Sequence, residues 1–106
     1  MMDANEFRAA AMGAGAEAKP PADLSPALAA LWHLARDEWD AAHHAAQSDS
    51  GRDGCWVHAH LHRVEGDLAN AGYWYRRADR PASEAALDAE WEELAAALLA
   101  AAAADP

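Results

Sequence analysis

The stretch WVHAHLHRVEGDLANAGYWYRR, residues 56–77, decides the fold of this chain. Its apolar and small residues recur every three or four positions, which is the period of one face of an α-helix. Gly66 interrupts this pattern, because glycine readily takes the left-handed conformation found just after a helix, and Asp67 is a typical N-cap residue. The stretch therefore predicts a helix over 56–65, a tight turn, and a second helix that ends before Pro81.

Similar signals on both sides of this stretch predict the remaining helices. Ser25 and Pro26 form an N-cap and a first helical position, and a turn near Asp37 divides the residues that follow into two helices. Ser83 is expected to cap a last helix, whose apolar stripe consists of Leu87, Trp91, Leu94 and Leu98. We therefore expect an all-α fold in which two antiparallel helix hairpins and a C-terminal capping helix form a single domain over residues 24–106.

Residues 1–23 are expected to be a loosely ordered N-terminal segment. They can form a short helix, but Gly13 and Gly15 weaken it, since glycine costs about 1 kcal/mol relative to alanine inside a helix. Pro20 and Pro21 then stop any helix and act as a stiff linker.

The composition excludes several classes of function. The 106 residues carry a net charge of −10, which repels phosphate backbones, so we expect no nucleic-acid partner. Apolar stretches are too short or too rich in alanine for a membrane span, so we expect no membrane partner. Cys55 is the only cysteine and cannot form an internal disulfide, which favours a reducing cytoplasm. No neighbouring base marks this thiol as reactive.

The chain also contains a weak internal repeat. A shift of 29 residues aligns LWHLARDEWDAAHH (31–44) with HLHRVEGDLANAGY (60–73) and places Asp37 on Gly66. Sequence identity is slight, but the helix, turn and small-residue positions coincide. A repeated helix pair explains this agreement better than two unrelated hairpins.

The second of these units resembles a tetratricopeptide-type repeat, particularly its Sel-like variant. Such repeats place a Gly-Asp turn, an alanine, aromatic residues and another alanine in this order, which here are Gly66-Asp67, Ala71, Trp74-Tyr75 and Ala78. The resemblance implies packed helix hairpins with a concave groove that takes peptides. The repeat is shorter than the usual length of about 34 residues, and two units are fewer than the roughly three that such arrays need. The last helix would therefore act as a cap, or the chain would form a homodimer.

The pattern WVHAHLHRVEGD…YWYRR also resembles a signature of a small, uncharacterised group of bacterial and fungal proteins. This second resemblance implies no particular activity. The chain contains no glycine-rich phosphate loop, no serine nucleophile motif and no Cys-x-x-Cys pair that would suggest one.

Histidines at helical spacing make a candidate metal site. His58 and His62 lie four residues apart, so their imidazoles can bind one ion, and Glu65 follows as a third ligand. His43 or His44 on the preceding helix would complete the set. These ligands fit zinc, and two histidines with one carboxylate also suit non-haem iron. The alternative is structural: His58 and His62 would pack helix against helix and hydrogen-bond to the backbone or to a carboxylate.

Trp56, His60 and Arg63 share another face of the same helix. By the resemblance this face lines the peptide groove, and aromatic and arginine side chains are the usual anchors of interfaces. The alternative is a solvated face with one partly packed tryptophan. Tyr73 and Trp74 are a further candidate contact, because one of the two lacks a packing position and should be exposed or meet another chain.

The sequence thus leads to two hypotheses. The first is a small cytoplasmic helical-repeat module that binds a protein or peptide partner, or a second copy of itself, without a cofactor or catalytic residues. The second is a metal-binding protein or metalloenzyme that holds zinc or iron on His58, His62 and Glu65.

Overall fold

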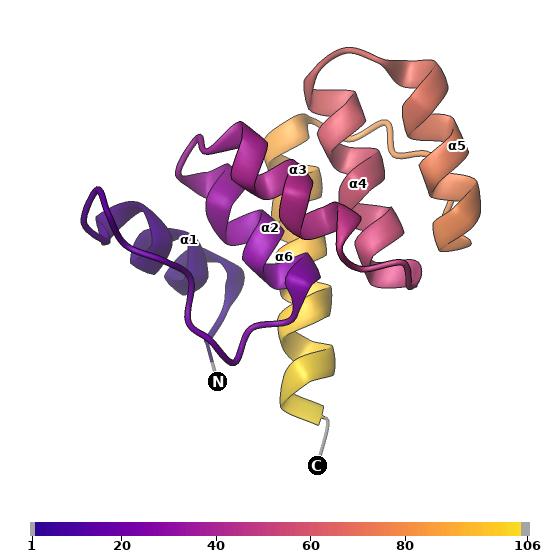
Figure 1. Cartoon of the computed structure of the whole chain (residues 1–106). Helices are drawn as coiled ribbons and strands as arrows, with labels where there is room; N and C mark the ends of the chain where they lie inside the picture. Colours follow the sequence, from indigo (N-terminus) through magenta and orange to yellow (C-terminus); the bar gives the residue numbers. More distant parts are fainter. Residues whose placement is uncertain (1, 105–106) are drawn as a thin grey trace.

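The computed structural model describes residues 2–104, which form six α-helices and contain no strand (Figure 1). The helices are α1 (Ala4–Gly13), α2 (Pro26–Ala35), α3 (Trp39–Gln47), α4 (Arg52–Val64), α5 (Leu68–Ala78) and α6 (Leu87–Ala104). The all-α fold class expected from the sequence is confirmed. Met1 of the expected segment 1–23 and residues 105–106 of the expected domain 24–106 lie outside the described residues.

Two short turns join four of the helices into the hairpins α2–α3 and α4–α5. Asp37 and Gly66 occupy equivalent places in these turns, and both are left-handed, with φ of 62° and 83°. In each turn the amide of the next residue donates, at 2.9 Å, to the carbonyl group five positions earlier, which closes the end of the helix. The structure therefore has both turns where the sequence predicts them.

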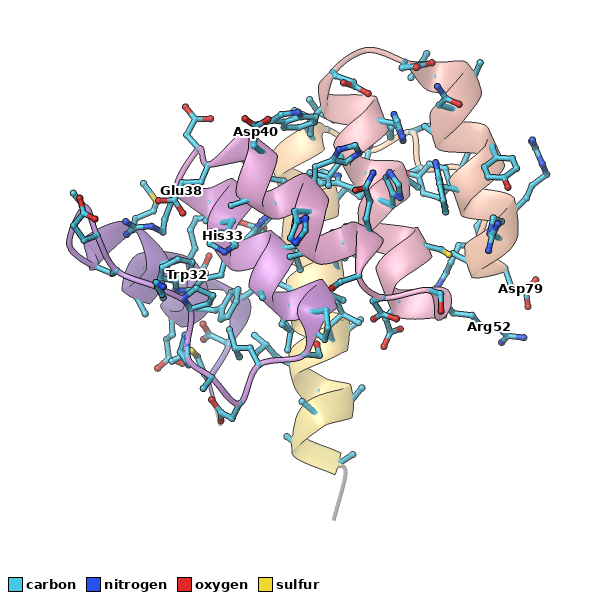
Figure 2. The ribbon with its side chains drawn as sticks, viewed as in Figure 1. Trp32, His33, Glu38, Asp40, Arg52 and Asp79 are labelled. Atoms are coloured by element: carbon cyan, nitrogen blue, oxygen red, sulfur yellow. The ribbon has the colours of Figure 1, made fainter. Side chains whose placement is uncertain are left out.

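Each turn also carries a contact between a histidine and a carboxylate. His33 Nδ1 lies 2.8 Å from Glu38 Oε1 in the first turn (Figure 2), and His62 Nδ1 lies 2.6 Å from Glu65 Oε1 in the second. The hydrogen bond from His33 is the main reason that the pKa of Glu38 is lowered. These contacts hold both histidines at the ends of α2 and α4.

α4 is the central helix, and it packs against α2, α3, α5 and α6. All eight residues from Gly54 to Leu61 are buried. Gly54 allows the preceding loop to approach closely, because a Cβ atom at this position would lie 2.1 Å from the carbonyl oxygen of Asp49. A helix covered on every side carries its histidines into the interior instead of presenting them on one polar face.

α6 lies behind α2 and α4 and packs against both (Figure 1). Trp91 anchors it, since the indole N–H donates to the carbonyl of Leu31 at 3.2 Å. The helix begins at Leu87, later than the cap predicted at Ser83, and in the segment before it Arg63 donates to the carbonyl group of Ala85 at 2.7 Å. Neither α6 nor any other helix of residues 2–104 has the length and apolarity needed to cross a membrane.

The N-terminal segment is packed more firmly than the sequence predicts. Phe7 is 3% exposed and stacks on Trp91 of α6, with ring centroids 6.1 Å apart. Asp3 and Glu6 form a capping box that starts α1. The guanidinium group of Arg36 closes the other end by donating to three carbonyl groups at 2.7–2.9 Å, those of Ala11, Ala14 and Gly15. Within the segment 1–23, which the sequence predicts to be loosely ordered, α1 therefore contacts both α2 and α6.

Candidate functional site

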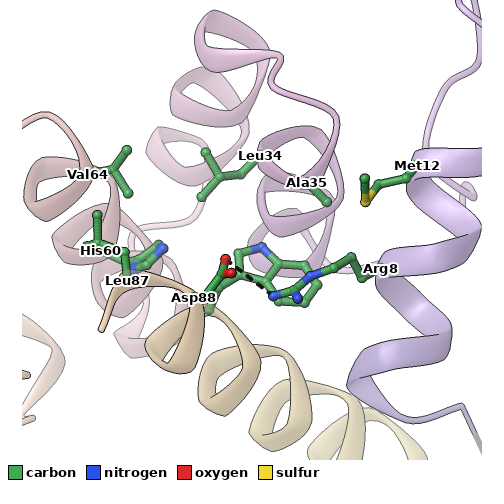
Figure 3. Close-up of a pocket in the computed structure, with 9 residues that line it drawn as sticks. Arg8, Met12, Leu34, Ala35, His60, Val64, Leu87 and Asp88 are labelled. Atoms are coloured by element: carbon green, nitrogen blue, oxygen red, sulfur yellow. Dashed lines mark ion pairs between the residues drawn. The ribbon is translucent and has the colours of Figure 1, made fainter. Parts of the chain in front are cut away.

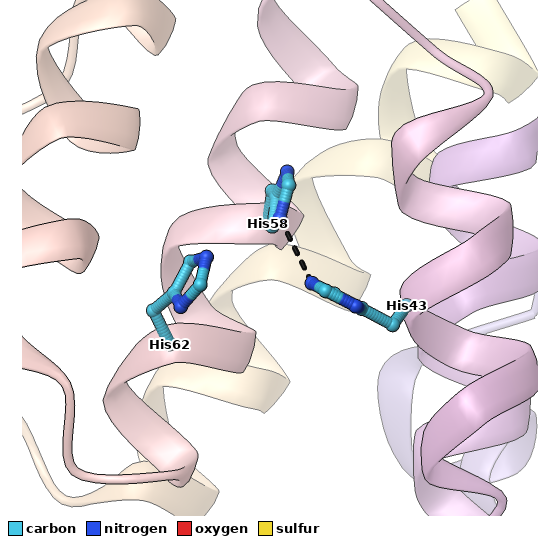
Figure 4. A group of neighbouring side chains, drawn as sticks. All are labelled: His43, His58 and His62. Carbon is cyan, nitrogen blue, oxygen red and sulfur yellow. Dashed lines mark hydrogen bonds between the residues drawn. The ribbon is translucent and has the colours of Figure 1, made fainter.

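Three histidines from two helices meet beside the α4–α5 hairpin. His43 projects from α3, and His58 and His62 lie one turn apart on α4 (Figure 4). One nitrogen atom from each ring lies within 4.8 Å of the others, and His43 Nε2 is 3.0 Å from His58 Nε2. The structure thus brings together three of the four residues predicted as metal ligands. His44, the alternative to His43, is exposed and outside this group.

His58 is the most deeply buried member of this histidine cluster (His43, His58 and His62). It is 4% exposed, and burial together with the nearby imidazoles of His43 and His62 lowers its pKa to about 4. The ring is therefore neutral at pH 7. A neutral imidazole offers the lone pair that a metal ion requires.

The contact between His43 and His58 contains a proton that a metal ion can replace. A hydrogen bond between two Nε2 atoms needs one of them to carry hydrogen and the other to accept it. When both nitrogen atoms bind a cation, that proton must leave. Metal binding at this cluster is therefore expected to release a proton and to weaken as the pH falls.

Glu65 orients His62 in this structure and is not grouped with the other two histidines. Its Oε1 atom accepts from His62 Nδ1 at 2.6 Å, so the proton lies on Nδ1 and the Nε2 lone pair is free. Histidine ligands of metals commonly donate their second N–H to a carboxylate in this way. Glu65 lies instead in a second group of possible ligand atoms, with His62 and Asp67, so its role as a direct ligand stays a prediction.

Aromatic rings hold the histidine cluster in position. The indole ring of Trp74 stacks on His58 with centroids 3.9 Å apart, and Trp39 stacks on His43 at 6.0 Å. Tyr73 packs edge-on against Trp74 but remains 44% exposed. Of the two aromatic residues that the sequence left open, Tyr73 therefore faces solvent and Trp74 packs beside the cluster.

The surface predicted from Trp56, His60 and Arg63 is not an open groove. Trp56 and His60 are 4% and 1% exposed, and the Arg63 side chain is 13% exposed. The expectation of an exposed peptide-binding face fails at these residues because α6 covers α4, and Glu90 of α6 meets both His60 and Arg63.

Glu90 is a buried charged residue that the sequence did not lead us to expect. Its carboxylate is buried between helices and accepts hydrogen bonds from His60 Nδ1 at 2.6 Å, from Arg63 at 2.7 Å and from the Tyr75 hydroxyl. Burial alone would raise the pKa of Glu90, but these donors outweigh it and lower the pKa. The available signal was spacing, since Glu90 lies three residues after Leu87 and therefore on the apolar side of α6.

Comparisons with protein families, with curated proteins and with solved structures find no match to this chain. The resemblance to tetratricopeptide-type repeats and to the bacterial and fungal group therefore stays a prediction.

Proposed function

We propose that this protein binds a divalent transition-metal ion through His43, His58 and His62. The observation that carries the proposal is the convergence of three imidazole nitrogen atoms within 4.8 Å, one of them on a ring that burial keeps neutral. The sequence left His43 and His44 open as the ligand from the preceding helix, and His43 is the one that lies beside His58 and His62.

Zinc is the metal that the donor set fits best. Zinc binds imidazole nitrogen at about 2.0–2.1 Å in tetrahedral geometry, which requires the three donor atoms to move to roughly 3.3 Å from one another. Two of them already lie 3.0 Å apart, so the main adjustment is a movement of the third ring. Iron is less favoured because the carboxylate of Glu65 is used by His62 Nδ1.

The direct test measures metal on protein that has been stripped with a chelator and then dialysed against zinc. We expect about one zinc ion per chain for the unmodified protein and a loss of most of it in His43→Ala, His58→Ala and His62→Ala. His44→Ala is the matched control, since His44 neighbours His43 but is exposed and outside the cluster. Circular dichroism identifies any variant that loses metal because it is unfolded. A folded His43→Ala protein with undiminished zinc would overturn the proposal.

The role of Glu65 gives a second test of the same site. Glu65→Ala removes the acceptor that orients His62, and such changes cost about 10- to 100-fold in metal affinity. Asp53→Ala is the control, because it removes an exposed acid from the first turn of the same helix. Isothermal titration with zinc measures both. Equal losses in the two variants would show that net charge, and not orientation of His62, sets the affinity.

A second candidate is the cytoplasmic helical-repeat module, which binds a protein or peptide or a second copy of the chain. It is supported by two hairpins with matching turns and by Tyr73, which is exposed on α5 with Arg77 donating to its hydroxyl at 3.0 Å. Sedimentation and crosslinking of the unmodified chain and of Tyr73→Ser test it. A monomer at all concentrations with no crosslinked partner in cell extract would count against this candidate and would leave the metal proposal untouched.

A further inference from the structure

A pocket of about 430 Å³ opens between α1, α2, α4 and α6, away from the histidine cluster (Figure 3). This volume lies within the range of about 300–1,000 Å³ that is usual for small-molecule sites. Most of its wall is apolar and is formed by Met12, Leu34, Val64, Leu87 and Trp91. At its edge Arg8 pairs with Asp88 at 3.8 Å.

The polar group in the wall of this pocket is His60, which is 1% exposed. Its Nδ1 atom is bonded to Glu90, and an ionised carboxylate only accepts, so Nδ1 carries the hydrogen. The Nε2 atom has no hydrogen-bond partner among residues 2–104, although every fully enclosed side-chain nitrogen or oxygen atom in that range has one. Nε2 is therefore open to the pocket, and Figure 3 shows the ring directed into it.

The hydrogen bonds around His60 define what its Nε2 atom can bind. Glu90 Oε1 accepts from both His60 Nδ1 and Arg63 Nη1, at 2.6 and 2.7 Å, so Nδ1 is occupied on the protein side. In the neutral ring, Nε2 presents a lone pair and accepts a hydrogen bond. Its ligand must supply an O–H or N–H group.

The edge of the pocket argues for an uncharged ligand. Arg8 is paired with Asp88 and Glu92 and lies over the ring of Trp91 at 4.4 Å, so its charge is already balanced. The chain as a whole carries a net charge of −10, which disfavours an anion. Leu87 and Met12 are 41% and 63% exposed, and a bound apolar group would remove their surfaces from water.

We propose that this pocket binds a compact, uncharged, largely apolar molecule with one hydrogen-bond donor, of the phenol or indole type, and that the donor bonds to His60 Nε2. In this arrangement the aromatic ring of the ligand lies against the side chains of Val64, Leu87 and Leu34. The site is separate from the proposed metal centre, because His60 points from α4 toward α6 while His58 and His62 lie on the side of α3 and α5.

The test compares ligands that differ only in the donor. Phenol and anisole, and indole and 1-methylindole, are titrated into ¹⁵N-labelled protein, with the His60 side-chain nitrogen signals and the pocket backbone amides as readouts. We expect saturable shifts with phenol or indole and about tenfold weaker binding of its methylated partner, which is the loss of one hydrogen bond. Equal affinity within both pairs, or no saturable binding by phenol and indole, would overturn the proposal.

Two variants at equivalent helix positions locate the site without altering the buried network. Leu87 and Leu68 are exposed leucines at the first positions of α6 and α5, and only Leu87 lines the pocket. Leu87→Glu is expected to weaken phenol binding about tenfold, since it replaces apolar contact with a charge, and Leu68→Glu to leave it unchanged. If both variants changed phenol binding equally, the ligand would not be bound in the pocket that Leu87 lines. His43→Ala should retain phenol binding, so a failure of the metal proposal would not be confused with a failure of this one.

Discussion

The side chain of Glu90 links α6 to both helices of the α4–α5 hairpin. Burying a carboxylate costs free energy unless hydrogen-bond donors surround it. Here three donors, two from α4 and one from α5, bond to the Glu90 carboxylate of α6. The same contacts raise the pKa of Tyr75, because burial and the hydrogen bond to Glu90 both disfavour ionisation of its hydroxyl. This network fixes the register of α6 on the hairpin.

Glu90→Gln tests this interpretation at the residue scale. The substitution preserves size but removes the charge that neutralises Arg63, and breaking a buried pair in this way costs about 3–5 kcal/mol. We expect the free energy of unfolding, measured with urea, to fall by an amount in this range. Glu93→Gln changes an exposed residue of the same helix and should alter it by less than about 0.5 kcal/mol. Similar values for both variants would mean that the network adds no stability.

At the scale of elements, α4 depends on a close approach that only glycine permits. Gly54 lies on the buried face where the loop before the helix passes, and any Cβ there meets the Asp49 backbone. Gly13, by contrast, lies at the end of α1, where an added Cβ atom would have no neighbour within 4 Å. A larger side chain is therefore sterically excluded at Gly54 and has room at Gly13.

We expect Gly54→Ala and Gly13→Ala to change stability in opposite directions. Overpacking in a well-packed region costs about 1–3 kcal/mol, so Gly54→Ala should lower the midpoint of thermal unfolding. Gly13→Ala should raise it slightly, because alanine in a helix gains roughly 0.5–1 kcal/mol over glycine. Two stabilising substitutions would show that the loop at Asp49 moves freely away from α4.

The attachment of α1 depends on Arg36, whose side chain is 7% exposed and lies over the ring of Trp32 at 4.7 Å. Arg36→Ala removes its hydrogen bonds to the end of α1. We expect amide hydrogen exchange in residues 4–18 to become faster, because the free energy of local opening there should fall by about 1–3 kcal/mol. Arg52→Ala removes an arginine that is 77% exposed and should leave this exchange unchanged. Unchanged exchange in Arg36→Ala would mean that Phe7 alone holds the segment.

For the whole molecule, the buried His58 makes stability depend on pH. Its pKa is about 4 in the folded protein and about 6.5 when unfolded, so between these values the unfolded chain binds more protons. Stability is therefore greatest above pH 6.5 and falls as the pH drops toward 4, by at most about 3 kcal/mol. The lowered pKa of Glu90 adds a further loss at more acidic pH, where that carboxylate becomes protonated.

Urea unfolding of metal-free protein at pH 7.5 and about pH 4.5 measures this dependence. The difference between the two values should shrink in His58→Gln, which no longer titrates, and persist in His44→Gln, where an exposed histidine is changed. Added zinc should steepen the dependence in the unmodified protein, since protons and metal compete for the same nitrogen atoms. An identical difference in all three proteins would show that His58 does not control it.

The sequence by itself determined the turns within the two hairpins and the start of α2. Ser25-Pro26, Gly66-Asp67 and the turn at Asp37 mark helix ends because caps and left-handed turns involve only neighbouring residues. His58 and His62 lie side by side because residues four positions apart are neighbours on one face of an α-helix. These features depend on spacing within one or two turns, which a sequence displays directly.

Only the tertiary structure decided which faces of α4 are covered. α6 packs over His60 where an open groove was expected, His43 joins the histidine cluster from another helix, and Arg36 secures α1 across more than 20 residues of sequence. Periodicity shows that a helix has an apolar or polar face, but it does not show which distant element packs against that face. The pairing of distant elements depends on the free energy of the packed core as a whole.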